Sequence, residues 1–97
     1  MEYIQVENQP RPFRFSLLAI KKLCKLTESK LSELGQVLDD IDNIITMIHI
    51  GFEMGAKKED VKIDFSRKDI EQWLDDDYSI LEQAMEIFSN SMSSGKK

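Results

Sequence analysis

The chain is poor in the residues that build metal centres and disulfide frameworks. Among its 97 residues there is one cysteine, Cys24, and one histidine, His49. A single cysteine cannot form an internal disulfide, and one cysteine with one histidine cannot complete a typical zinc site. The acidic stretch at Asp40 and Asp42 lacks the third ligand and the glycine of an EF-hand loop. We therefore expect no disulfide, no metal and no cofactor.

Long apolar runs are also missing. No run approaches the roughly 18 residues that cross a membrane, and residues 1–5 lack the basic-then-apolar layout of a signal peptide. Residues 51–55 match the GxxxG pattern of membrane helices, but they include Glu53 and precede two lysines. We expect a cytoplasmic protein without membrane contact.

Catalytic patterns are absent as well. His49 falls in a predicted helix with no nucleophile motif near it, and such a histidine is usually structural. Cys24 lies between lysines, yet its place on an apolar stripe favours a buried, unreactive thiol. The pair Gly95-Lys96 lacks the glycine-rich lead-in of a phosphate loop. We expect a protein that is not an enzyme.

Charge is unevenly spread along the chain, whose net charge is −5. Residues 1–31 carry six basic and three acidic side chains, whereas residues 32–97 carry seven basic and fifteen acidic ones. The acidic majority argues against nucleic-acid binding, for which the only footprint would be Arg11, Arg14, Lys21, Lys22 and Lys25. Either the opposed charges guide head-to-tail self-association, giving a homo-oligomer, or both regions are simply solvated.

The patterns predict a mainly α (α+β) fold: a small helical domain of four to five helices after an N-terminal β-hairpin. The hairpin pairs residues 3–6 with residues 13–15 around a proline-containing turn at residues 8–12. A first helix runs over residues 16–26, with an inner stripe of Leu17, Ile20, Leu23 and Cys24. A short helical turn over residues 31–34 ends at Gly35. The domain covers residues 1–92, and residues 93–97 form a flexible tail.

The helix over residues 40–54, ended by Gly55, is the most informative element. Acidic residues at its start suit the helix dipole. It is apolar on two sides, with one stripe of Ile41, Ile44, Ile45, Ile48 and Phe52 and an opposite stripe of Met47, Ile50 and Met54. Such a helix is either central in its domain or sandwiched between its domain and a partner.

Two further helices follow. The alternation at Val61, Ile63 and Phe65 indicates a short strand or an extended lead-in. Ser66 with Asp69, and Ser79 with Glu82, have the spacing of capping boxes. The first helix has an apolar face of Ile70, Trp73 and Leu74, and the acids at residues 75–77 open the second. The second helix has a broad apolar face that includes Met85, Phe88 and Met92.

Methionine-bearing faces are the candidate partner-binding surfaces, because methionine adapts to irregular partners. The candidate residues are Met47, Ile50, Met54, Met85, Phe88 and Met92. The alternative interpretation is that these methionines fill gaps in the core.

The order of motifs resembles the short tail-assembly chaperones of long-tailed bacteriophages and prophages. The matching segments are FRF at residues 13–15, AIKKL at residues 19–23 with Thr27, IGF at residues 50–52 and DFSRKDIEQWLD at residues 64–75. Glu28 stands where the family often has glycine, and Cys24 where it often has an acid. The resemblance spans roughly residues 3–92.

This resemblance implies a non-catalytic protein of the bacterial host cytoplasm that is absent from the finished particle. It would bind the tape-measure protein and help to recruit tail-tube protein subunits. The alternative is a small cytoplasmic adaptor or regulator of a mobile element that binds one protein partner.

Overall fold

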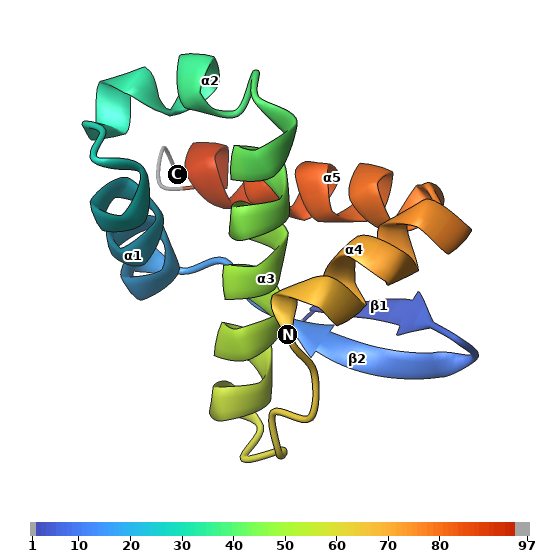
Figure 1. Ribbon diagram of the computed structural model, residues 1–97. Coiled ribbons are helices and arrows are strands. Elements are labelled where there is room, and N and C mark those ends of the chain that lie inside the picture. The colour runs from blue at the N-terminus through green and yellow to red at the C-terminus, as the bar shows by residue number, and fades with distance from the viewer. Residues whose placement is uncertain (1, 95–97) are drawn as a thin grey trace.

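The computed structural model describes residues 2–94 and confirms a small, mainly helical fold with an N-terminal hairpin (Figure 1). The elements in chain order are β1 (Glu2–Val6), β2 (Gln9–Phe13), α1 (Leu17–Thr27), the 3-10 turn η1 (Leu31–Glu33), α2 (Leu34–Val37), α3 (Ile41–Lys58), α4 (Arg67–Asp76) and α5 (Ser79–Ser94). Of the predicted tail, residues 93 and 94 belong to α5, and residues 95–97 lie outside the described residues.

The hairpin turns earlier than predicted. Strands β1 and β2 are antiparallel, with Val6 opposite Gln9, so the turn is Glu7-Asn8 and not the proline segment. Both turn residues have positive φ, at 52° and 68°, which fits the type I′ turn of two-residue hairpin loops. Pro10 and Pro12 lie within β2, which is an edge strand and therefore tolerates residues without an N–H.

Helix α3 is the centre of the molecule, as Figure 1 shows, and contacts α1, α4, α5 and β2. Ile48 and Phe52 on one side are buried, and so are Met47 and Ile50 on the other. We predicted that this helix is either central in its domain or sandwiched between the domain and a partner. The burial of both sides shows that it is central for most of its length. Ile41 is the exception, with 57% of its surface exposed at the helix start.

Neither α2 nor α3 ends at the glycine where the sequence predicted its end. Gly35 lies inside α2, and Gly55 lies inside α3, which continues to Lys58. A Cβ at Gly51 would overlap the ring of Phe13, and one at Gly55 would overlap the Pro12 carbonyl. The GxxxG segment thus provides the bare surface on which β2 crosses α3, and the Arg14 N–H donates to the Gly51 carbonyl at 3.0 Å.

Local signals located the starts of α3 and α4 correctly. The Asp40 carboxylate accepts from the N–H of Asp42 at 2.8 Å, and Ser66 and Asp69 form the predicted capping box. The Ser79 box was wrong: Ser79 is already helical, and its N–H and hydroxyl both donate to the Asp77 carboxylate. Only Asp77 opens α5, because α4 includes Asp76.

The predicted inner stripe of α1 also needs correction. In α1 the buried residues are Ala19 and Leu23, while Leu17 is 77% exposed, so the inner stripe is rotated from the predicted one. Residues 61–66 belong to no helix or strand, so of the two alternatives the lead-in to α4 is correct. Thr27 is followed by Glu28, which has a left-handed φ of 53° at the C-cap of α1. This is a conformation that glycine adopts most readily.

Candidate protein-binding groove

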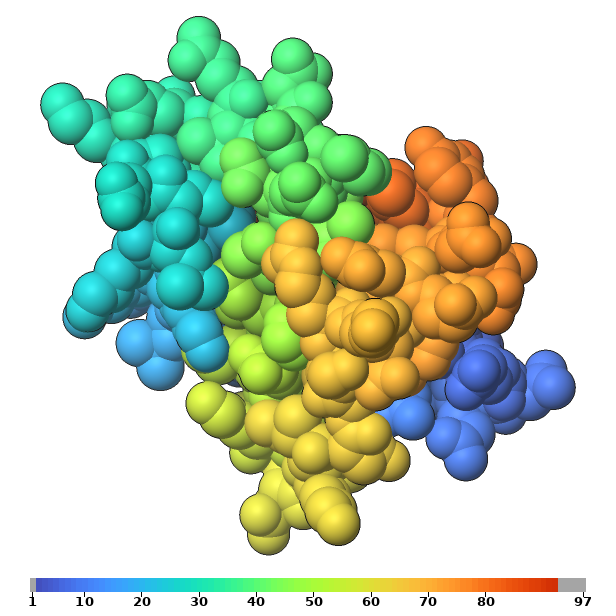
Figure 2. Space-filling model, in the orientation of Figure 1, coloured from blue at the N-terminus to red at the C-terminus, as the bar shows by residue number. Residues whose placement is uncertain are grey.

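Two hollows of the molecular surface follow the seam between α1 and α3. Figure 2 shows α3, in lime green, recessed between α1 in cyan and α4 in orange. One hollow, of about 410 Å³, is bounded by α1, α3 and Arg67 of α4, and a second, of about 300 Å³, is bounded by Arg14, Ser16, Leu18 of α1 and the last turns of α3. We call the two together the α1–α3 groove.

One ridge of α1 forms the wall of this groove. Leu18, Lys22 and Leu26 follow the i, i+4, i+8 spacing that places side chains in one row on a helix. Leu18 is 64% exposed and Leu26 is 59% exposed, so the row offers two leucines to a partner. Single exposed leucines are ordinary on protein surfaces, but here two of them lie in one row, one at each hollow, with Lys22 between them.

Polar residues of α3 also line the larger hollow, namely Asn43, Thr46, His49 and Glu53. Arg67 from α4 donates to the Thr46 hydroxyl at 2.7 Å and to the Asp42 carbonyl at 2.9 Å. Its guanidinium also lies 3.5 Å from the Glu71 carboxylate. Arg67 therefore holds α4 beside α3 and sets the width of the groove at this end.

An ion pair spans the groove. The Lys22 ammonium of α1 lies 3.3 Å from the Glu53 carboxylate of α3, and the same carboxylate lies 3.4 Å from His49 Nε2. Partly exposed pairs of this kind contribute roughly 0–1 kcal/mol. A bound segment can therefore displace the pair at little cost.

The groove is basic overall. Its charged lining residues are five cations against one carboxylate, namely Arg14, Lys22, Lys57, Lys58 and Arg67 against Glu53. Such a surface favours a partner that carries acidic side chains beside an apolar stripe.

The six predicted partner-binding residues do not form one surface. Met47 is fully buried, Ile50 is 2% exposed and Phe88 is 8% exposed, with the Phe88 ring 5.0 Å from that of Phe15. These three residues belong to the core, although Ile50 also lines the larger hollow of the groove. Met85 and Met92 are half-buried and pack against the core, while Met54 lines the smaller hollow of the groove.

Leu18 and Leu26, the two exposed leucines of the groove wall, were not among the residues predicted to bind a partner. The predicted inner stripe of α1 contained Leu17, because its spacing from Ile20 and Cys24 is that of one helix face. The structure instead buries Ala19 and Leu23. The signal that identifies them is the row Leu18–Lys22–Leu26, which lies beside the true inner face of Ala19 and Leu23.

The described part of the chain was also searched for metal-binding clusters and membrane-spanning helices. Within residues 2–94 no cluster of three or more histidine, cysteine or acidic side chains is arranged to bind a metal. No helix in that range combines the length and apolarity needed to cross a membrane. Comparisons with protein-family models, curated proteins and solved structures found no match to this chain.

Proposed function

We propose that this protein is a tail-assembly chaperone of a long-tailed bacteriophage or prophage, and that it binds a helical segment of the tape-measure protein in the α1–α3 groove. In this role it also helps to recruit tail-tube subunits and performs no catalysis. The observation that carries the proposal is the groove, with its exposed leucines, Met54 and its basic rim.

The groove suits a helical client for geometrical reasons. Its wall is a straight row of side chains along α1, and an amphipathic helix laid along such a row presents its apolar residues at the same i, i+4 spacing. Leu18 and Leu26 provide apolar contacts near the two ends, and Met54 adapts to the shape of the client. Basic residues around them attract acidic side chains that flank the client's apolar stripe.

The residues that carry the family resemblance support the proposal in a second way. Phe13 packs edge-on against Phe52 with ring centroids 5.0 Å apart, and Phe52 packs against Trp73 at 5.5 Å. These residues, with Gly51 beneath Phe13, fix β2, α3 and α4 relative to one another. The resemblance thus rests on the residues that position two of the groove's three helices.

The test is co-expression with the tape-measure protein of a phage that encodes this chain. We expect the wild-type protein to keep the tape-measure protein soluble and to co-purify with it, and the double variant Leu18→Asp/Leu26→Asp to lose both properties. Leu31→Asp is the matched control, because Leu31 is 58% exposed and lies outside the groove.

Two outcomes would contradict the proposal. If the double variant still solubilises the tape-measure protein, the groove is not its binding site. If the wild-type protein neither solubilises nor binds it, the chaperone role itself is wrong, and the adaptor alternative becomes the better interpretation.

A further inference from the structure

The pairing register of the hairpin determines which backbone groups of β1 face outward. In an antiparallel pair of strands, only every second residue pair exchanges backbone hydrogen bonds, and the other residues direct their N–H and C=O groups away from the partner strand. The pair that closes a two-residue turn is hydrogen-bonded, so the next pair is not. Gln5 therefore stands opposite Pro10, and Tyr3 opposite Pro12, in pairs that are not hydrogen-bonded. The backbone N–H and C=O groups of Tyr3 and Gln5 consequently point outward from β1.

The outer edge of β2 is closed in two ways. Pro10 and Pro12 provide no N–H there, and prolines are one device by which natural sheets prevent pairing at an edge. The same edge also lies against α3. The Pro12 carbonyl leaves no room for a Cβ at Gly55, and the Arg14 N–H donates to the Gly51 carbonyl at 3.0 Å. A further strand cannot pair with β2.

The outer edge of β1 has neither protection. The strand contains no proline, and within residues 2–94 no backbone group outside the hairpin forms a hydrogen bond with Tyr3 or Gln5. Both residues are exposed, Tyr3 at 49%. Figure 2 shows the first part of the chain, in dark blue, at the rim of the molecule. Two donors and two acceptors on this edge are thus accessible to a further strand.

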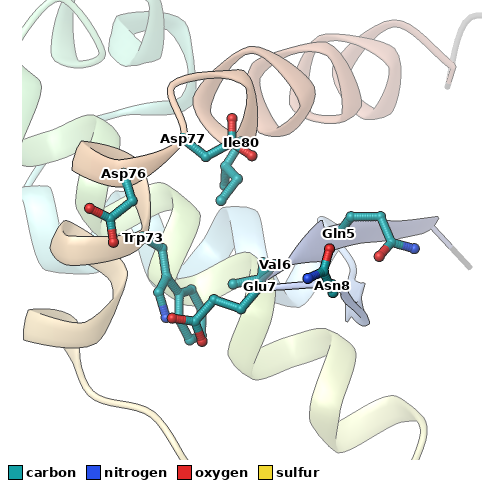
Figure 3. A pocket seen from close by; sticks show the side chains of 8 residues that line it. All are labelled: Gln5, Val6, Glu7, Asn8, Trp73, Asp76, Asp77 and Ile80. Atoms are coloured by element: carbon teal, nitrogen blue, oxygen red, sulfur yellow. The ribbon is translucent and has the colours of Figure 1, made fainter.

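A hollow of about 270 Å³ lies where β1 enters the turn (Figure 3). Its lining combines the apolar side chains of Val6, Trp73 and Ile80 with the carboxylates of Glu7, Asp76 and Asp77. Among residues 2–94, no basic side chain lines it, and the groups that donate to Asp76 and Asp77 belong to the neutral residues Gln72 and Ser79. The hollow suits a long basic side chain, whose aliphatic stem would lie on the apolar wall and whose charge would meet the carboxylates.

We infer that the outer edge of β1 accepts an added strand from a different protein, an extended segment with lysine or arginine at alternate positions. The backbone of this segment pairs with Tyr3 and Gln5, and one of its basic side chains enters the hollow at the turn. In strand addition of this kind, the main-chain hydrogen bonds provide affinity and pockets for alternate side chains provide specificity.

Charge selects a basic segment over a second copy of β1 as the occupant. Residues 2–8 carry Glu2 and Glu7 and no basic side chain, and the hollow adds Asp76 and Asp77. A second β1 at this edge would bring glutamates of the two strands together, whereas basic residues on an added strand pair with them. The edge and its hollow share no residue with the α1–α3 groove, so this inference does not depend on the proposed client.

The experiment titrates a peptide of about eight residues, in which lysine alternates with valine, into the full chain by isothermal titration calorimetry. We expect this peptide to bind. A peptide of the same charge with prolines in place of valines should bind about tenfold more weakly or worse, because it lacks the N–H groups that strand pairing needs. A peptide with glutamates in place of lysines should also bind about tenfold more weakly or worse, because its charges face the carboxylates.

Gln5→Pro removes one outward N–H of β1 and should weaken binding of the lysine peptide about tenfold. Proline fits at such an unpaired edge position, as Pro10 directly opposite shows, so we expect the circular dichroism of the variant to match wild type. The matched control is Gln5→Ala, which removes the same side chain, keeps the N–H and should bind like wild type.

Amide hydrogen exchange of the wild-type chain gives a readout that needs no variant. The N–H groups of Tyr3 and Gln5 should exchange rapidly in the free protein and become protected when the lysine peptide binds. Those of Ile4 and Val6 face β2 and should be protected in both states. Non-specific attraction between a basic peptide and an acidic protein would leave the exchange of Tyr3 and Gln5 unchanged.

Four results would overturn the inference: no binding of the lysine peptide, equal binding of the proline peptide, equal binding by Gln5→Pro and Gln5→Ala, or unchanged exchange at Tyr3 and Gln5. Protection of these two amides that rises with the concentration of the chain alone would assign the edge to a second copy and overturn it as well. None of these results bears on tape-measure binding by Leu18 and Leu26, so the two proposals fail separately.

Discussion

Gly51 and Gly55 show how a missing side chain can position a whole strand. On the surface of α3 they leave room for the Phe13 ring and for the backbone of Pro12, which any Cβ would displace. Such close approach permits the hydrogen bond from the Arg14 N–H to the Gly51 carbonyl. These glycines are therefore retained in a helix interior despite a cost of about 0.5–1 kcal/mol each relative to alanine.

Gly55→Ala should destabilise the protein, because the new methyl group meets backbone atoms of Pro12, which cannot rotate away as a flexible side chain can. We expect a loss of roughly 1–3 kcal/mol in the free energy of unfolding, measured by urea denaturation. Gly35→Ala is the control with the opposite sign. A methyl group at Gly35, in α2, would meet no atom within 4 Å, and the φ of Gly35 is not positive, so alanine should stabilise by about 0.5–1 kcal/mol. Equal effects of the two substitutions would refute this account of β2 packing.

Side-chain oxygens of aspartate and serine set the starts of three helices in this protein. Asp40 and Ser66 cap α3 and α4, and Asp77 bonds the first residue of α5. At the α4–α5 junction three consecutive acids have different roles. Asp77 stabilises the start of one helix, whereas Asp75 lies in the last turn of another, where the helix dipole disfavours negative charge.

Alanine substitutions at Asp77 and at Asp75 should change the free energy of unfolding in opposite directions. Asp77→Ala removes the acceptor for the Ser79 N–H and hydroxyl and should lower the free energy of unfolding by about 1 kcal/mol. Asp75→Ala should raise it by about 0.3–1 kcal/mol, because it removes an unfavourable charge. Thermal unfolding followed by circular dichroism measures both. A stabilising effect of Asp77→Ala would show that the junction is not held by this cap.

At the scale of the whole molecule, the hairpin is tied to the segment around the end of α3 by contacts far apart in sequence. Arg11 pairs with Asp64 at 3.0 Å and lies over the Phe65 and Trp73 rings. The Tyr3 hydroxyl donates to the Glu59 carboxylate at 2.7 Å. The hydrogen bond and charge of Arg11 lower the pKa of Asp64 below its ordinary value of 3.8.

This lowered pKa predicts a pH-dependent contribution to stability. A carboxyl whose pKa is depressed on folding stabilises the protein above its unfolded pKa, and the contribution is lost as the pH falls through the folded value. Asp64→Asn should therefore be less stable than wild type at neutral pH, and the difference should shrink in acid below the ordinary value of 3.8. Urea midpoints over this range provide the measurement. A difference that stays constant over this range would show that the charge of Asp64 does not stabilise the fold.

Much of the secondary structure could be predicted from the sequence, because its signals are local. The starts of α3 and α4 follow from acceptors at Asp40 and Ser66, which satisfy N–H groups two or three residues away. The hairpin and most helices follow from apolar periodicity and the residues that interrupt it. The hairpin turn was misplaced because Glu7-Asn8 is a weak turn signal beside two prolines, although Asn8 tolerates positive φ.

Tertiary structure decided which apolar faces are core and which are exposed. The amphipathicity of α3 is the same whether Met47 and Ile50 meet a partner or another helix of the same chain, and packing among α1, α4, α5 and β2 buries both. Likewise Leu17, Leu18 and Leu26 resemble core residues by composition, yet the orientation of α1 against α3 leaves them exposed. Composition and apolar periodicity are enough to predict the acidic balance, the separation of basic from acidic segments and most of the helices. Which apolar stripes are buried depends on contacts between residues far apart in the chain, so only the fold decides it.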